Sequence, residues 1–480
     1  MSSTNKLATG TKITSVIIGA FFTGIMWHCR GQHGFGSSWG LFSVGAVLTM
    51  LIFAFYGNRR KMKFELIPLG AILMGATVTG WGTVNSQMSG LLSSQVPFSG
   101  NAEVSYTEIS PYTGLMMMLI MGFTLIPLFS FFTGSLFSKR EYKIYHYIIA
   151  VAVFFGVSYL MRATLSHYIL NAIHPKAVEA FSLGLKDAGK DLTPMKAYLE
   201  HFSNMSWAKK IPYGRNYFMS IENISNAIAA IAVSLTALIA FKDKLTCLVS
   251  FGINIFAAIS TTVADIFLVI DESTGLFASV TPPSWLVGGS WSLWEFGTGF
   301  GIGLFTMLII AVLPKEISAG NKFRGESLFE NKIIRFIYNF AAFTFVFGVV
   351  PGRVLGLRIF EIFEDAGKIK DGDLPGTIVC AVCGVAFAVY AFITFKKNIL
   401  DKNMSIPFKM KPFEFANKAL TAYLPFCVAA YFLLGSLPVK DIFSSASLIT
   451  DRVVAFVMLI SFIVSYPLYL IGKKHLTKTR

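Results

Sequence analysis

The chain has 480 residues, of which 54% are hydrophobic and only 14% are charged. Soluble proteins carry roughly a quarter charged residues, so this composition excludes a soluble globular protein. The formal net charge of +15 would suit a nucleic-acid partner if the basic residues formed one patch. They are instead spread over short segments between apolar runs, so we expect no nucleic-acid partner.

Apolar runs of about 20 residues, each long enough to cross a bilayer core, recur along the whole chain. A backbone in lipid must satisfy its own hydrogen bonds, so these runs predict helices and an all-α fold. We expect an integral membrane protein that crosses the membrane about twelve times. The spans are predicted at 13–29, 39–56, 66–84, 113–137, 144–170, 225–241, 246–270, 293–314, 333–357, 377–395, 418–437 and 452–472.

Basic residues concentrate in alternate loops, at 58–63, 139–140, 396–397 and in the tail 473–480. Because Lys and Arg are enriched on the cytoplasmic side, this pattern predicts cytoplasmic N- and C-termini. A bacterial-type plasma membrane is the expected location. No cleavable signal peptide is expected, because the first apolar run is followed by His and Arg rather than by a small-residue cleavage site.

No linker divides the chain, so residues 1–480 are expected to form one membrane domain with one long extracytoplasmic loop, 171–224. Within this loop, 178–186 has helical spacing, and the segment from Asp191 to His201 is typical of a capped amphipathic helix. The loop is expected either to rest on the outer lipid surface or to cap the bundle.

Rare polar residues fall at the predicted outer ends of the spans, where ionisable groups often indicate function. His28, Arg30 and His33 lie at the first outer turn, and Asn85 and Gln87 follow the third span. The remaining members, in chain order, are Arg162, His167, Glu222, Asn223, Asn226, Asp265, Trp294, Glu295 and Arg353.

Each of these residues also has a structural interpretation. Tryptophan at a span end is typical of the membrane interface, and an isolated Asn is typical of helix–helix contacts. Arg162 is the most informative of them, because a buried guanidinium requires a carboxylate or an anionic ligand. Asp265 and Glu295 are the partners expected from the sequence, and a purely structural ion pair is the alternative.

The chemistry available to this set is general acid–base catalysis combined with anion binding. The residues expected to be catalytic are His28, His33, Asp265 and Glu295. The residues expected to bind substrate are Arg30, Asn85, Gln87, Arg162, His167, Trp294 and Arg353. No cofactor or metal is expected: the nearest metal-like spacing, Cys380-Ala-Val-Cys383, lies inside a predicted span with no partner Cys or His nearby.

Three fragments resemble, in order, the signatures of prolipoprotein diacylglyceryl transferase. They are His33-Gly34, Gly80-Trp-Gly-Thr-Val-Asn-Ser-Gln87 and Trp294-Glu295-Phe-Gly-Thr-Gly299. The resemblance implies transfer of a diacylglyceryl group from a phospholipid. The chain departs from that family at Gln87, where Glu is usual, in lacking the Arg of the middle motif, and in having more than seven predicted spans.

Three functions therefore remain open, of which two are the main candidates. One is a transferase whose site opens on the outer leaflet and acts on a lipid or lipid-linked anionic substrate, with membrane lipids as partners. The other is a secondary transporter of a small anionic or polar solute, for which about twelve spans and cytoplasmic termini are a common arrangement. A third possibility is a non-catalytic assembly or receptor protein. The placement of the polar residues at the predicted outer ends of the spans favours the transferase. The predicted number of spans favours the transporter.

Overall fold

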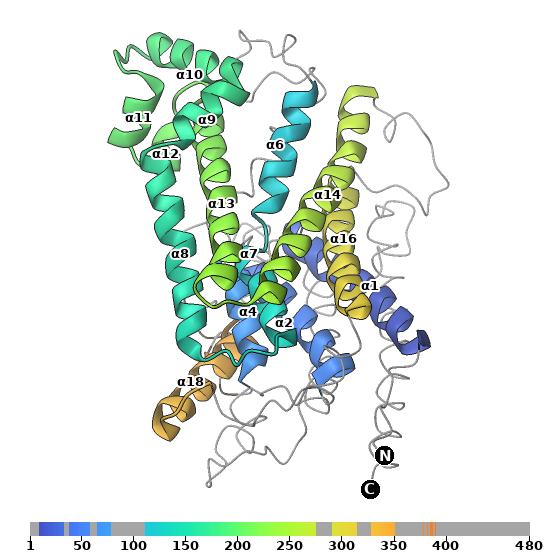
Figure 1. Cartoon of the computed structure of the whole chain (residues 1–480). Coiled ribbons are helices and arrows are strands. Elements are labelled where there is room, and N and C mark those ends of the chain that lie inside the picture. Colours follow the sequence, from blue (N-terminus) through green and yellow to red (C-terminus); the bar gives the residue numbers. More distant parts are fainter. Residues whose placement is uncertain are drawn as a thin grey trace, which may run out of the picture. The chain divides into compact units, whose positions relative to one another are not determined.

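The computed structural model describes residues 9–32, 38–57, 65–77, 111–274, 290–313 and 328–350, with isolated positions between 378 and 389. The elements in these ranges are helices, and no strand occurs among the described residues (Figure 1). The predicted all-α fold is therefore confirmed for the described part of the chain. The predicted spans 418–437 and 452–472 lie outside it.

Among the described residues, four helices are long and apolar enough to cross a membrane. They are α8 (Ile144–Ala163), α13 (Gly214–Ile239), α14 (Lys244–Thr274) and α16 (Ser290–Val312). A fifth candidate is a broken span, in which α6 (Pro111–Phe123) and α7 (Pro127–Phe137) meet at 52°. The prediction of membrane-spanning helices is confirmed at this level, whereas the number of about twelve spans and the cytoplasmic termini stay predictions.

The other described helices that overlap predicted spans have apolar stretches too short to meet this criterion. They are α1 (Thr9–Gln32), α2 (Ser38–Ile52) with the π-helical turn η1 (Phe53–Gly57), α4 (Leu66–Ala76), and α18 (Lys332–Thr344) with the π-helical turn η3 (Phe345–Val349). Each overlaps a predicted span. Because α4 has only 11 residues, its helix alone is shorter than the roughly 20 residues that cross a bilayer.

The chain forms two compact units. Unit 1 comprises Met1–Ala76, Phe132–Tyr147 and Pro282–Arg480, and unit 2 comprises Thr77–Phe131 and Ile148–Thr281. The chain passes from one unit to the other within α7 and within α8. The expected single domain therefore stays a prediction.

In unit 1, α1 and α16 pack with their backbones in close contact. A side chain at Gly303 would collide with the carbonyl oxygen of Gly19, and one at Gly299 would collide with Trp27. Gly299 and Gly303 are four residues apart and therefore share one face of α16. Since higher-numbered residues of α1 meet lower-numbered residues of α16, the two helices run antiparallel. Small residues permit this close approach between apolar helices.

In unit 2, four short helices lie at one end of α8 and α13 (Figure 1). They are α9 (Ser166–Ile173), α10 (Pro175–Asp187), α11 (Pro194–Glu200) and α12 (Met205–Ala208). The helices expected within 171–224 are thus present, and the Thr193 hydroxyl caps α11 by accepting a hydrogen bond from the Lys196 backbone N–H.

Two predicted span boundaries in unit 2 are wrong. The span expected at 144–170 ends at Ala163, because the chain turns at Thr164 and Leu165 before α9 begins. The span expected at 225–241 begins at Gly214 instead. Its first turns mix polar and apolar residues, which interrupts the apolar run on which the prediction rested. They are buried and contact α10 and α12, and this packing stabilises them as helix.

Candidate functional site

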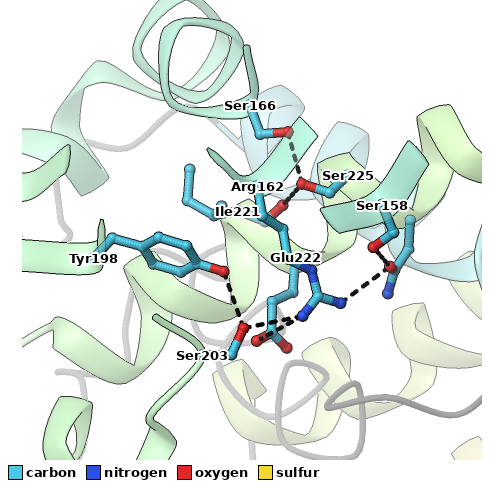
Figure 2. A network of polar contacts seen from close by, with 9 residues as sticks. Ser158, Arg162, Ser166, Tyr198, Ser203, Ile221, Glu222 and Ser225 are labelled. Carbon is cyan, nitrogen blue, oxygen red and sulfur yellow. Dashed lines mark hydrogen bonds and ion pairs between the residues drawn. The ribbon is translucent and has the colours of Figure 1, made fainter. Parts of the chain in front are cut away.

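Arg162 lies in the last turn of α8 and pairs with Glu222 of α13, with 3.4 Å between guanidinium nitrogen and carboxylate oxygen. The guanidinium also donates hydrogen bonds to the Ser203 hydroxyl (3.1 Å) and to the Asn226 side-chain oxygen (3.2 Å). Figure 2 shows these groups converging between the two helices. The need of Arg162 for a carboxylate is confirmed, but the expected partners, Asp265 and Glu295, were wrong.

The pairing follows from helical periodicity. Ser158 and Arg162 are four residues apart on α8, and Glu222 and Asn226 are four apart on α13, so each pair shares one helix face. The Ser158 hydroxyl donates to the Asn226 side chain at 2.6 Å, which joins the same two faces one turn away. Both side chains are nearly buried, so each charge is compensated by the other within unit 2.

The loop between α11 and α12 completes this cluster. Ser203 has a left-handed backbone, with φ of 53°, which L-residues adopt at some cost in energy. Its hydroxyl lies 3.4 Å from the phenol oxygen of Tyr198. Burial, together with the charge of Glu222, raises the pKa of Tyr198 to about 12. The phenol therefore stays protonated at physiological pH.

His167 is hydrogen-bonded to groups in the same region. Its Nε2 lies 2.8 Å from the backbone carbonyl oxygen of Arg162, and its Nδ1 lies 2.9 Å from the phenol oxygen of Tyr217. Burial lowers the pKa of His167, which favours the neutral ring. Because a carbonyl can only accept, Nε2 carries the proton and Nδ1 accepts from Tyr217. Both ring nitrogens are thus occupied by protein groups.

A second group of polar residues was not recognised as a group from the sequence. Four side chains of α14 are fully buried and lie at intervals of four, seven and four residues: Ser250, Asn254, Thr261 and Asp265. This spacing places them on one face of the helix, and we call them the polar stripe. The opposite face, with Ile255 and Val263, is exposed. The stripe runs nearly the length of a candidate membrane span, Lys244–Ile266.

The polar stripe faces the break between α6 and α7. A side chain at Gly122, near the end of α6, would collide with Ala258 of α14, and the ring of Phe123 lies 6.4 Å from that of Phe251. At the start of α7, the Ser130 hydroxyl lies 3.1 Å from the Ser250 hydroxyl. Asn254 lies between these contacts.

Asn254 differs from the other residues of the stripe. Its side chain is fully buried, and neither its Oδ1 nor its Nδ2 has a hydrogen-bond partner among the described residues. The buried side chains of the facing helix α6 include Met117, Met118 and Met121, which offer only weak acceptors. A helix–helix contact through Asn requires a polar partner. The described part of the chain supplies none.

In unit 1, Trp294 and Glu295 lie near the start of α16, and both side chains are buried. The antiparallel packing places them at the same end of the helix pair as His28 and Arg30, which lie in the last turns of α1. The backbones of these two candidate segments are therefore brought together, and the side chains of His28 and Arg30 lie outside the described ones. His33, Asn85, Gln87 and Arg353 lie outside the described residues.

Asp265 is placed by the structure in the polar stripe, in unit 2. Glu295 belongs to unit 1, so these two expected catalytic carboxylates lie in different units. No group of three or more His, Cys, Asp or Glu side chains is arranged to hold a metal ion among the described residues.

Comparisons of the chain with protein-family models, with curated proteins and with solved structures give no match. The resemblance to prolipoprotein diacylglyceryl transferase therefore stays a prediction.

Proposed function

We propose that the protein is a secondary transporter of a small polar or anionic solute, and that the solute passes through unit 2 beside the polar stripe of α14. The observation that carries this proposal is Asn254. A buried amide without a hydrogen-bond partner costs about 1–3 kcal/mol for each unmet group. That cost, at the middle of a candidate span, is expected where a side chain meets a solute, an ion or water.

The broken span supports the same proposal. Transporters commonly bind solutes and ions near the midplane, where a discontinuous helix exposes the ends of its two halves. Here α6 and α7 meet at 52°, and the last turn of α6 and first turn of α7 both contact α14 around Asn254. A helix break is unfavourable in lipid unless it is buried or lines a polar path.

We further propose the cell membrane as the location, with both termini in the cytoplasm. The basic loops of the sequence support this orientation. Transport is assigned to the secondary class because the sequence contains no phosphate-binding Gly-rich loop that would bind a nucleotide.

The test is uptake of radiolabelled solutes by proteoliposomes, with a panel of neutral polar and anionic compounds. The variant Asn254→Leu keeps the branched shape and the number of heavy atoms of the side chain and removes both polar atoms. We expect it to reduce uptake of the transported solute at least about tenfold, which corresponds to about 1.4 kcal/mol of lost interaction.

The matched control is Asn339→Leu, which replaces a nearly buried asparagine of α18 in unit 1 whose Oδ1 also has no partner among the described residues. This control is expected to retain uptake. No saturable uptake of any solute by the wild-type protein, or equal uptake by both variants, would contradict the proposal.

A second candidate function is the transferase that acts on a lipid or lipid-linked anionic substrate. It is favoured by the placement of Glu295 and Trp294 at the same end of the α1–α16 pair as His28 and Arg30. Mass spectrometry of cell lipids distinguishes the two functions. A changed lipid profile in Glu295→Gln with normal uptake favours the transferase, and normal lipids in Glu295→Gln with uptake lost in Asn254→Leu favour transport.

A further inference from the structure

Three serine hydroxyls lie close together at the N-terminal end of the polar stripe. The Ser250 hydroxyl of α14 lies 3.1 Å from that of Ser130 and 2.8 Å from that of Ser234, which belongs to α13. Ser130 also donates to the Pro127 carbonyl oxygen at 2.8 Å, and Ser234 donates to the Ala230 carbonyl oxygen at 3.1 Å. All three side chains are buried.

The serine cluster has fewer hydroxyl protons than close oxygen–oxygen contacts. Each hydroxyl carries one proton, and the three hydroxyls take part in four close contacts. When Ser130 and Ser234 donate to backbone carbonyls, Ser250 can donate to only one of them. One oxygen–oxygen contact is then left without a proton, so the cluster has a surplus of oxygen lone pairs.

Asn254 adds another oxygen to this surplus. It lies one turn from Ser250 on the same face of α14, so its side chain is a neighbour of the serine cluster. Its Oδ1 has no hydrogen-bond partner among the described residues. The C-terminal end of α6 reaches the same part of α14 at Gly122 and Phe123, and a helix C-terminus carries partial negative charge.

We infer that Asn254, Ser250 and the adjoining end of α6 form a binding site for a monovalent cation, with Na⁺ as the ion that the site takes. At the broken helices of transporters, unwound backbone carbonyls and helix C-terminal ends coordinate Na⁺. Here the Asn254 side-chain oxygen and the Ser250 hydroxyl supply further oxygen ligands. The inference rests on the proposed transport function, in which this ion drives uptake of the solute.

Other ligand classes suit these residues less well. Divalent Ca²⁺ and Mg²⁺ sites use carboxylates, and the ligand atoms named here are neutral oxygens. An anion would require several hydrogen-bond donors, and at this site the Asn254 Nδ2 is the one donor group without a partner among the described residues. The α7 N-terminus, the obvious source of donors, begins with Pro127, which has no backbone N–H.

The test uses the purified full-length protein in detergent. Its thermal unfolding is measured in NaCl, KCl and choline chloride at equal ionic strength. Because a ligand that binds only the folded state raises Tm, we expect Tm to rise saturably, by ~2 °C or more, in NaCl relative to choline chloride. Asn254→Leu and Ser250→Ala should each abolish the rise, and Asn339→Leu should retain it.

A further variant separates a ligand oxygen from a hydrogen-bond donor. Asn254→Asp keeps an oxygen at the same position and removes the amide N–H, so the Na⁺-dependent rise in Tm should persist. The same Tm in all three salts, or a rise that survives both Asn254→Leu and Ser250→Ala, would overturn the cation site.

The uptake assay distinguishes this inference from the proposed function. Uptake that requires Asn254 but is equal in NaCl and choline chloride, with no Na⁺ effect on Tm, leaves transport standing and rejects the cation site. A Na⁺-specific Tm rise that requires Asn254, with no uptake of any solute, supports the cation site and rejects transport.

Discussion

Arg162 and Glu222 depend on each other because both side chains are nearly buried in unit 2. A charge left alone in such surroundings keeps its desolvation cost and loses its partner, whereas removal of both charges loses little. Ser203 and Asn226 share the guanidinium, so the pair is embedded in a wider hydrogen-bonded cluster (Figure 2).

This dependence predicts a strongly non-additive double-mutant cycle. Arg162→Met and Glu222→Gln should each lower the free energy of unfolding by about 3 kcal/mol, and the double variant should recover more than half of that loss. Thermal or denaturant unfolding of purified protein measures these values. The control is Lys196→Met, which breaks an exposed pair with Glu200 and should cost less than about 0.5 kcal/mol. Additive losses would contradict a coupled buried pair.

A second prediction concerns His174, which lies between α9 and α10 with its Nε2 unpartnered among the described residues. Burial lowers the pKa of His174 to about 4. The unfolded chain, with a His pKa near 6.5, therefore binds more protons than the folded state between about pH 4 and 6.5. The free energy of unfolding should rise by about 3 kcal/mol across this window and then level off, as far as His174 contributes.

The measurement for His174 is the pH dependence of unfolding in the wild type and in His174→Phe. The variant should lose the part of the pH dependence of the unfolding free energy that His174 contributes, because phenylalanine takes up no proton in either state. Identical slopes for the two proteins would show that His174 is not held neutral by burial.

The sequence predicted that Arg162 needs a carboxylate but did not identify it. Glu222, Asn223 and Asn226 were recognised as polar residues at the start of a span, yet nothing in the local pattern links them to α8. The four-residue spacings at Ser158 and Arg162 and at Glu222 and Asn226 become informative only when the two faces are known to meet. Only the tertiary structure shows that these faces of α8 and α13 are in contact.

At the scale of elements, the packing of α1 on α16 depends on glycine. Gly303→Leu should destabilise unit 1, because the new side chain would meet the Gly19 carbonyl and Thr23 of α1. Overpacking of this kind costs about 1–3 kcal/mol. The matched control is Gly156→Leu on α8, where the side chain would meet nothing within 4 Å.

Folded yield and Tm of the two leucine variants check this prediction. Gly156→Leu should be neutral or stabilising, by up to roughly 0.8 kcal/mol, since leucine favours helix over glycine. If Gly303→Leu is as stable as Gly156→Leu, the close contact of α1 and α16 is wrong.

Hydropathy was sufficient to locate α8, α14 and α16, because a long apolar run has only one way to satisfy its backbone in lipid. It was insufficient for α13, whose first turns mix polar and apolar residues. It also did not predict the break after Phe123, because the two apolar halves read as one span, 113–137. Pro127 was the available signal, since proline favours the first turn of a helix over its interior.

At the scale of the whole molecule, the sequence predicted an all-helical membrane protein, and the described helices agree. Sidedness, the number of spans and the convergence of the outer polar residues stay predictions, because His33, Asn85, Gln87 and Arg353 lie outside the described residues. The polar stripe was missed because its few polar residues leave the mean hydropathy of the span at 1.8, and their shared face appears only when α14 is viewed as a helix.

The most direct test of a solute path along α14 is cysteine labelling in a variant that lacks the native cysteines. Single cysteines are placed at Asn254 and Thr261 on the polar stripe, and at Ile255 and Val263 on the opposite face, and treated in membranes with a water-soluble thiol reagent. A water-accessible path along α14 predicts labelling at positions 254 and 261. It predicts little labelling at positions 255 and 263, because the exposed face that carries them would contact lipid. Labelling at Ile255 and Val263, with none at the two stripe positions, would contradict the account.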